Sequence, residues 1–313
     1  MIRSVATVFL VFACLSQMQA AAQARRRQPK PAVSARTLAL YEPGEYRGVK
    51  YRLMKPIDFD PTTTYPLVLS LHGAGGRGTD NIRNLRNWNE YMADDTLRRR
   101  YPCFVLVPQS DTSWNDPTSE RTVRIDVSDD DVAALPEAWR SRLLHYRERF
   151  GEGPVGNLHI VLDLIDSKLA KDFQIDTDRI YCLGHSMGGF GTFTAIYQHP
   201  DRFAAAIPTA GGFFPWRDAS RIKDVPIWTF HGSADQTVPV EFTRYVFQRM
   251  QELGGNMKST ELRGVGHGAN AIAFRYTEDD PAKGYVTQYA SDRVDKTPDI
   301  WDWLFRQKLS NRQ

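Results

Sequence analysis

The most constraining feature of this sequence is a series of short apolar runs separated by segments with helical periodicity. The runs are nearly continuous in apolar residues, which is expected of strands buried on both faces of a parallel sheet. They are Leu67–Leu71, Phe104–Val107, Ile180–Leu183, Ala204–Ile207 and Ile227–Phe230. Strands that alternate with helices predict an α/β fold, with a mostly parallel central sheet and helices on both faces.

The expected helices lie between and after these strands. Apolar residues recur at intervals of three and four in Leu158–Leu169 and in Phe242–Met250. A last helix is expected over Pro298–Phe305, because proline and an acidic residue favour a helix N-terminus. Val49–Met54 alternates instead, and it predicts an antiparallel strand before the parallel ones.

The first residues of the chain predict an export signal. Arg3 is followed by the apolar core Val5–Ala13, and small residues precede a cleavage site after Ala24. This core is too short for a stable membrane anchor. A secreted or periplasmic protein is therefore expected. Lipid anchoring through Cys14 is the alternative, because Val11–Cys14 loosely resembles a lipoprotein cleavage box.

The remainder of the chain predicts a flexible lead-in and one α/β domain. After the signal at 1–24, residues 25–44 are rich in Arg, Gln, Pro and Ala and lack a clear apolar period, so we expect them to be flexible. Residues 45–310 contain the expected strands and helices without a compositional break. Two connections, 111–156 and 269–297, are unusually long, and long connections of this kind are expected to cover a site at the sheet edge.

Charge and cysteine content limit the possible functions. The net charge of +3 is small, and much of the excess lies in Arg25–Arg27 and Lys30, so no nucleic-acid-binding face is predicted. Removal of the signal leaves Cys103 and Cys182. If another strand lies between the two strands that carry these cysteines, the two Cα atoms are about 9–10 Å apart. That distance is too long for a disulfide. Two free, buried thiols are expected.

The pentapeptide Gly-His-Ser-Met-Gly at 184–188 carries the first chemical signal. It stands between the expected strand Ile180–Leu183 and an expected helix from Gly191 onward. In that context a serine is held on a sharp strand-to-helix turn with its Oγ exposed, the nucleophile elbow. The flanking glycines allow the close approach of the two backbones. The pattern predicts that Ser186 is a nucleophile; a glycine-rich turn with an incidental serine is the alternative.

A serine hydroxyl is a weak nucleophile, so it needs a base that is itself oriented by a carboxylate. In this type of site the chain order is serine, acid, histidine. Asp235 follows the strand Ile227–Phe230, and His267 follows the alternating segment Met257–Leu262 in a glycine-flanked loop. All three residues are then expected at the carboxyl edge of the sheet. The chain order of the three residues and their positions after strands favour a triad of Ser186, His267 and Asp235.

The glycine-rich stretch after Leu67–Leu71 predicts an oxyanion hole. Residues 72–78 are His-Gly-Ala-Gly-Gly-Arg-Gly, and the glycines let the backbone approach a ligand. We expect the N–H groups of Ala74 and Met187 to bind the negative charge that develops on the substrate oxygen. A phosphate-binding loop is not favoured, because the stretch lacks the Gly-Lys-Ser/Thr ending of a P-loop.

Four further residues are candidates for substrate binding: His72, Gly73, Trp114 and Trp216. The positions of both tryptophans after expected strands fit either a pocket lining or burial in the core. His72 and His231 each open a His-Gly turn, and a structural hydrogen-bonding role is favoured for both. His185 flanks the serine but is expected to point away from it. No metal site is expected.

Together these motifs resemble the α/β-hydrolase superfamily over about residues 45–310. More narrowly, they look like secreted polyhydroxybutyrate-depolymerase-like, feruloyl and acetyl-xylan esterases and the predicted peptidase/phospholipase-like group. The resemblance implies a serine carboxylic ester hydrolase with Ser186, Asp235 and His267 as its triad, an acyl-enzyme intermediate and no cofactor. The implied substrates are acyl or feruloyl esters of carbohydrates, or polyesters.

Two other functions stay open at this point. The same triad and oxyanion hole serve amides, so a secreted serine peptidase of the prolyl-oligopeptidase-like type is the first alternative. A non-catalytic interaction domain on a hydrolase scaffold is the second. Such a domain is expected to have lost a triad member or the elbow glycines, and this chain has kept them. The motifs leave the acyl group, the alcohol and the oligomeric state open.

Overall fold

The computed structural model describes residues 33–312 except 87, 117, 119–128, 130–132, 134–136, 138–139, 142–155 and 213–215. The predicted signal, Cys14 and most of the long 111–156 connection therefore lie outside the described residues. Within the described part of the chain, every helix is too short or too polar to cross a membrane.

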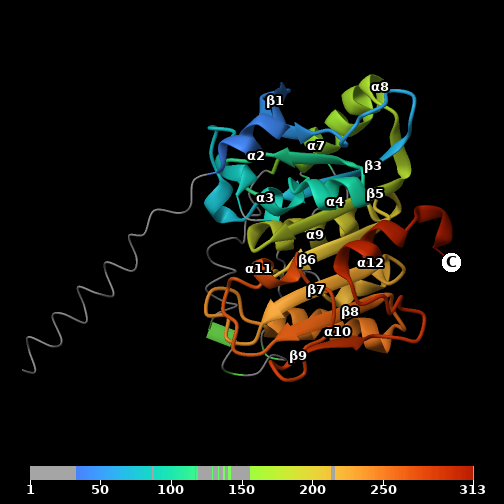
Figure 1. Ribbon diagram of the computed structural model, residues 1–313. Helices are drawn as coiled ribbons and strands as arrows, with labels where there is room; N and C mark the ends of the chain where they lie inside the picture. The colour runs from blue at the N-terminus through green and yellow to red at the C-terminus, as the bar shows by residue number, and fades with distance from the viewer. Residues whose placement is uncertain are drawn as a thin grey trace, which may run out of the picture. The chain divides into compact units, whose positions relative to one another are not determined.

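The described strands form one mixed sheet of nine, in the order β1-β2-β4-β3-β5-β6-β7-β8-β9 (Figure 1). The strands from β4 to β8 in this order run parallel, whereas β1, β2 and β9 pair in antiparallel fashion at the two edges. This topology confirms the predicted mostly parallel α/β fold. The bounds are Tyr41–Tyr46 (β1), Val49–Met54 (β2), Tyr65–Leu71 (β3), Phe104–Pro108 (β4), Ile175–His185 (β5), Ala205–Thr209 (β6), Ile227–Gly232 (β7), Met257–Leu262 (β8) and Tyr285–Tyr289 (β9).

The five apolar runs of the sequence become β3, β4, β5, β6 and β7, which lie in the interior of the sheet. Every residue of β3, β4, β6 and β7 is buried. Burial on both faces removes the polar face that an alternating strand would need, which is why these runs are continuously apolar. Val49–Met54 is antiparallel to both of its neighbours, as its alternation predicts.

Helices cover both faces of the sheet and enclose two separate apolar layers. Side chains of α7, α9 and α10 contribute to one layer, and those of α3, α11 and α12 contribute to the other. The α-helices are Ala35–Leu40 (α2), Trp88–Met92 (α3), Asp95–Arg100 (α4), Leu158–Leu164 (α7), Ala170–Asp172 (α8), Met187–Gln198 (α9), Glu241–Glu252 (α10), Asn270–Ala273 (α11) and Ile300–Arg306 (α12). Shorter helical turns are Ala74–Gly76 (η1), Arg83–Leu85 (η2), Ile165–Leu169 (η3, a π-helix), Pro200–Arg202 (η4), Trp216–Ile222 (η5) and Leu309–Asn311 (η6).

The N-terminal boundary of the fold differs from the prediction. Residues 25–44 are expected to be flexible, but α2 and β1 occupy 35–46. Ser34 accounts for the helix, because its Oγ accepts a hydrogen bond from Thr37 N and its own N–H donates to Glu90. A six-residue helix held by a cap and one distant carboxylate leaves no apolar period in the sequence.

The connection 269–297, whose expected role as a cover over a site stays a prediction, includes two regular elements. It contains α11, and β9 pairs with β8 from Lys258↔Tyr289 to Leu262↔Tyr285. In Figure 1 this strand lies at the edge of the sheet opposite β1.

Both cysteines of the described chain are free and buried, as predicted. Cys103 directly precedes β4 and Cys182 lies in β5, and β3 separates these two strands. Burial raises the pKa of each thiol to about 12. The thiols therefore stay protonated at neutral pH, which makes them poor nucleophiles.

A lysine is enclosed in the core at β8. The side chain of Lys258 is fully buried, and its Nζ donates a hydrogen bond to Thr297 O at 2.7 Å. The same nitrogen lies 3.5 Å from the centre of the Trp228 ring. Burial lowers the pKa of Lys258 to about 7, although the carboxylates of Asp295 and Asp279 act in the opposite direction. Below about pH 7 the folded protein therefore carries a cation at a site that disfavours charge.

We predict that Lys258 makes the free energy of unfolding rise with pH above about 7. The unfolded lysine keeps its proton up to its ordinary pKa of 10.5. Between the two values the unfolded state binds more protons, so raising the pH favours the folded state. Lys258→Met should raise the free energy of unfolding below neutral pH and flatten this dependence in urea titrations. The exposed Lys283→Met is the control. An equally steep dependence in Lys258→Met contradicts the prediction.

Candidate active site

Ser186 occupies a strained turn between β5 and α9. Its backbone has φ 58° and ψ −119°, and a positive φ is costly for a residue with a side chain. Two hydrogen bonds hold the turn: Ser186 N donates to Thr209 O at 3.0 Å, and Phe190 N donates to Ser186 O at 2.9 Å. The serine therefore stands between the end of a buried strand and the first turn of a helix, as the sequence predicts.

The glycines around Ser186 are required because several backbone segments meet there. A Cβ at Gly188 would overlap the carbonyl oxygen of Leu71, and a Cβ at Gly184 would overlap the carbonyl oxygen of Gly188. A Cβ at Gly73 would lie 3.0 Å from the carbonyl oxygen of His185. The loop after β3 thus packs directly against the turn that carries the serine.

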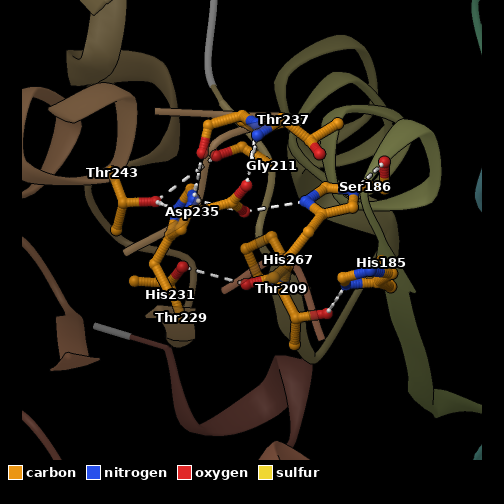
Figure 2. A network of polar contacts seen from close by, with 12 residues as sticks. His185, Ser186, Thr209, Gly211, Thr229, His231, Asp235, Thr237, Thr243 and His267 are labelled. Carbon is orange, nitrogen blue, oxygen red and sulfur yellow. Dashed lines mark hydrogen bonds and ion pairs between the residues drawn. The ribbon is translucent and has the colours of Figure 1, made fainter. Parts of the chain in front are cut away.

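Ser186, His267 and Asp235 lie in one chain of hydrogen bonds (Figure 2). His267 Nε2 is 2.8 Å from Ser186 Oγ, and His267 Nδ1 is 2.7 Å from Asp235 Oδ2. The serine follows β5, the aspartate follows β7 and the histidine follows β8. Because these strands are parallel, their carboxyl ends bring the three side chains to one edge of the sheet.

The carboxylate of Asp235 is buried and ionised. Its Oδ1 accepts hydrogen bonds from Thr237 N at 2.8 Å and Val238 N at 2.9 Å. Burial alone would raise the pKa of Asp235, but hydrogen bonds from His231, His267 and the two backbone N–H groups hold it well below its ordinary value. An ionised Oδ2 keeps the proton of the neutral imidazole on His267 Nδ1, so Nε2 is free to accept the serine proton.

The two predicted oxyanion donors begin helical segments beside the serine. Met187 is the first residue of α9, and Ala74 is the first residue of η1. An N–H group at this position has no acceptor within its own helix, and the N-terminus of a helix favours negative charge. The contact of Gly73 with the serine turn brings the two segments close together. Their role as donors to a substrate stays a prediction.

His72 and Trp114 support the glycine-rich loop from inside the protein. The side chains are only 3% and 2% exposed, and their ring centres are 4.7 Å apart. Trp114 Nε1 donates to His72 O at 2.9 Å, and Ser110 N donates to His72 Nε2 at 3.0 Å. Burial lowers the pKa of His72 to about 4, so its ring is neutral. Both side chains are enclosed and already hydrogen-bonded, which fits the structural role favoured for His72 and the core burial that the sequence left open for Trp114. A contact of either side chain with substrate stays a prediction.

The other two candidates for substrate binding are placed less fully. Gly73 lies beside the serine turn, where only a residue without a side chain fits easily. Trp216 begins η5, but its side chain lies outside the described residues, as do residues 213–215.

Two histidines that sequence reasoning set aside adjoin the proposed base and acid. The His185 ring lies 4.9 Å from the His267 ring between centres, and His185 Nδ1 lies 3.1 Å from Thr209 Oγ1. Burial lowers the pKa of His185 to about 3, so this ring is also neutral. His231 Nε2 is 3.3 Å from Asp235 Oδ2. The one sequence signal for His231 is its place four residues before the acid on a strand end.

The arrangement joins a hydroxyl, an imidazole and an orienting carboxylate at one point, which suits nucleophilic attack on a carbonyl. Among the residues that the structure describes, no group of three or more His, Cys, Asp or Glu side chains is placed to hold a metal ion.

The chain is similar to known esterases in sequence and in structure. Residues 156–275, which include Ser186, Asp235 and His267, match a family model described as phospholipase/carboxylesterase. The solved structure of a thermostable esterase is 31% identical to this chain, with a TM-score of 0.62 over 87% of this chain and 64% of that one. The chain has the α/β-hydrolase fold, and the family model and the esterase structure support its place in the α/β-hydrolase superfamily.

Two curated proteins are also similar to this chain. An uncharacterized secreted protein of Arthroderma benhamiae is 26% identical over 275 residues, which are 77% of this chain and 25% of that protein. A bifunctional acetylxylan esterase/xylanase of Neocallimastix patriciarum is 38% identical over 79 residues, 25% of this chain and 11% of that protein. This chain thus spans a quarter or less of the length of these two relatives.

A ferulic acid esterase from Anaeromyces mucronatus shares the α/β-hydrolase fold. It has 15% identity and a TM-score of 0.50, over 79% of this chain and 90% of that one. At this level of identity the likeness concerns the fold.

We predict that Gly188→Ala lowers the free energy of unfolding by more than about 2 kcal/mol, because the added methyl group forces β3 and α9 apart. Urea denaturation measures the change. Gly268→Ala is the matched control, since a Cβ there meets no atom within 4 Å. Equal stability of the two variants would show that the backbones are not tightly apposed.

Proposed function

We propose that this α/β hydrolase is a secreted serine carboxylic ester hydrolase with Ser186 as nucleophile, His267 as general base and acid, and Asp235 as the orienting carboxylate. The observation that carries the proposal is the hydrogen-bonded chain from Ser186 Oγ to Asp235 on a strained strand-to-helix turn. The phospholipase/carboxylesterase model and the esterase relative support an ester substrate. The predicted signal at 1–24 and the relative described as secreted support export.

In the proposed mechanism Ser186 Oγ attacks the ester carbonyl while His267 Nε2 takes the hydroxyl proton. The tetrahedral intermediate places a negative charge on the former carbonyl oxygen. His267 then returns the proton to the leaving alcohol, and an acyl group stays on Ser186. Water repeats the same steps on the acyl-enzyme and releases the acid.

The surrounding groups lower the barrier by stabilising charge as it forms. The N–H groups of Met187 and Ala74 face the oxyanion, and loss of one such donor costs about 3–4 kcal/mol in other hydrolases. The ionised Asp235 stabilises the imidazolium that His267 becomes. Because that carboxylate is buried and fully hydrogen-bonded, little reorganisation is needed when the positive charge appears.

We propose acyl or feruloyl esters of carbohydrates, or polyesters, as the substrate class. The acetylxylan esterase/xylanase relative is the curated protein whose described activity supports an acylated carbohydrate. The ferulic acid esterase adds that the same fold accommodates an aromatic acyl group. No cofactor enters the proposed reaction, because each proton and each charge has a protein group assigned to it.

Replacement of the nucleophile tests the mechanism. Ser186→Ala should lower the hydrolysis of p-nitrophenyl acetate by at least about 1,000-fold and should abolish labelling by a fluorophosphonate probe. The exposed Ser220→Ala is the control, and circular dichroism reports whether each variant is folded. A folded Ser186→Ala protein with wild-type activity contradicts the proposal. Labelling of neither the wild type nor the control favours the alternative of a non-catalytic interaction domain.

A substrate panel separates esterase from peptidase activity. Values of kcat/KM should be higher for acetylated xylan, feruloylated sugars or polyhydroxyalkanoate than for short peptide amides, with plain acyl esters as the reference. Higher values for peptides, lost in Ser186→Ala, would contradict the ester assignment while leaving the nucleophile in place.

A further inference from the structure

His231 is a fully enclosed histidine that touches the same carboxylate oxygen as the proposed base. It lies near the end of β7 and is only 1% exposed. Its Nε2 is 2.9 Å from Val238 O and 3.3 Å from Asp235 Oδ2 (Figure 2). The mechanism described above assigns no role to this ring. The atoms around its two ring nitrogens indicate what His231 does.

The neighbours of His231 determine which of its nitrogens carries a proton. Val238 O and Asp235 Oδ2 are both acceptors, so Nε2 must carry a proton and donate it. Nδ1 lies 2.7 Å from Thr243 Oγ1, and that hydroxyl also lies 3.3 Å from Gly211 O. The hydroxyl of Thr243 therefore contacts the ring at the nitrogen that does not face Asp235.

His231 lies among other titratable groups. Those that face it are Asp235 and, beyond this carboxylate, His267 and His185. The contact of His231 Nε2 with Oδ2 means that this ring and the proposed base share the charge of one carboxylate.

The contact completes the hydrogen bonding of the carboxylate. Oδ1 accepts two backbone N–H groups. The described contacts of Oδ2 are with His267 Nδ1 at 2.7 Å and, more weakly, with His231 Nε2 at 3.3 Å, and the His231 proton is shared with Val238 O at 2.9 Å. The terminal torsion of an aspartate is broad, so donors on Oδ1 alone leave Oδ2 able to shift. Oδ2 is the atom that orients His267, and a second donor on it limits this movement.

We propose that His231, held by Thr243, is a positioning residue that fixes Asp235 Oδ2 where it accepts the Nδ1 proton of His267. This role rests on the proposed function of the triad. His231 also affects how strongly Oδ2 attracts the proton of His267, because both rings contact this oxygen. Loss of the His231 donor makes Oδ2 a stronger acceptor for His267, favours the imidazolium, and thus shifts the protonation of the base as well as its position.

Three variants test the proposal in the p-nitrophenyl acetate assay. His231→Leu removes the donor, His231→Gln keeps a side-chain N–H, and Thr243→Val removes the hydroxyl that holds the ring at Nδ1. His231→Leu should lower kcat about 10- to 100-fold with little change in KM, and should move the acid limb of the kcat/KM profile to higher pH. His231→Gln should recover most of the activity, and Thr243→Val should fall between the two.

The outcomes separate this proposal from a purely structural role. Equal losses in His231→Leu and His231→Gln with an unmoved acid limb, or wild-type kcat in both, would overturn it. If His231→Leu does not fold, as judged by circular dichroism, Thr243→Val serves as the test. A wild-type kcat or an unmoved acid limb in Thr243→Val would then overturn the proposal. Ser186→Ala is measured alongside: its retained activity would refute the proposed function, whereas its loss together with unaffected His231 variants would refute the positioning role alone.

Discussion

The close approach of backbones around Ser186 is the constraint on which the site depends. The end of β3, the loop after it and the first turn of α9 meet where a single methyl group on Gly188 would not fit. This apposition holds Ser186 at a positive φ and sets the glycine-rich loop beside it. The buried apolar strands also hold the site in place, because a rigid parallel sheet keeps the carboxyl ends of its strands in fixed positions.

The site also depends on the hydrogen bonds around the buried carboxylate of Asp235. Asp235 stays ionised inside the protein because backbone and imidazole donors replace the water it has lost. That charge fixes the tautomer of His267, and the tautomer decides whether Ser186 can lose its proton. The imidazole ring of His267 thus links the hydrogen-bonded carboxylate of Asp235 to the hydroxyl of Ser186.

The sequence predicted most of what depends on local pattern and chain order. The buried strands, the serine turn and the positions of Asp235 and His267 followed from apolar runs and from loops after strands. What it missed depends on contacts between distant segments. The sequence left open whether Trp114 lines a pocket or is buried, and its hydrogen bond to His72 O joins residues 42 positions apart. Helix α2, which was not predicted, is held partly by a bond to Glu90. The approach of His231 to Asp235 depends on the path of the loop after β7, which periodicity does not describe.

The most direct test of the account is to trap the covalent intermediate. Acid quenching during turnover of p-nitrophenyl acetate, followed by peptide mass spectrometry, locates any acyl group on the chain. The account predicts one acetyl group on Ser186, formed at least as fast as steady-state turnover and absent from Ser186→Ala. Rapid turnover with no acetyl group on Ser186, or with the acetyl group on another residue, would contradict it.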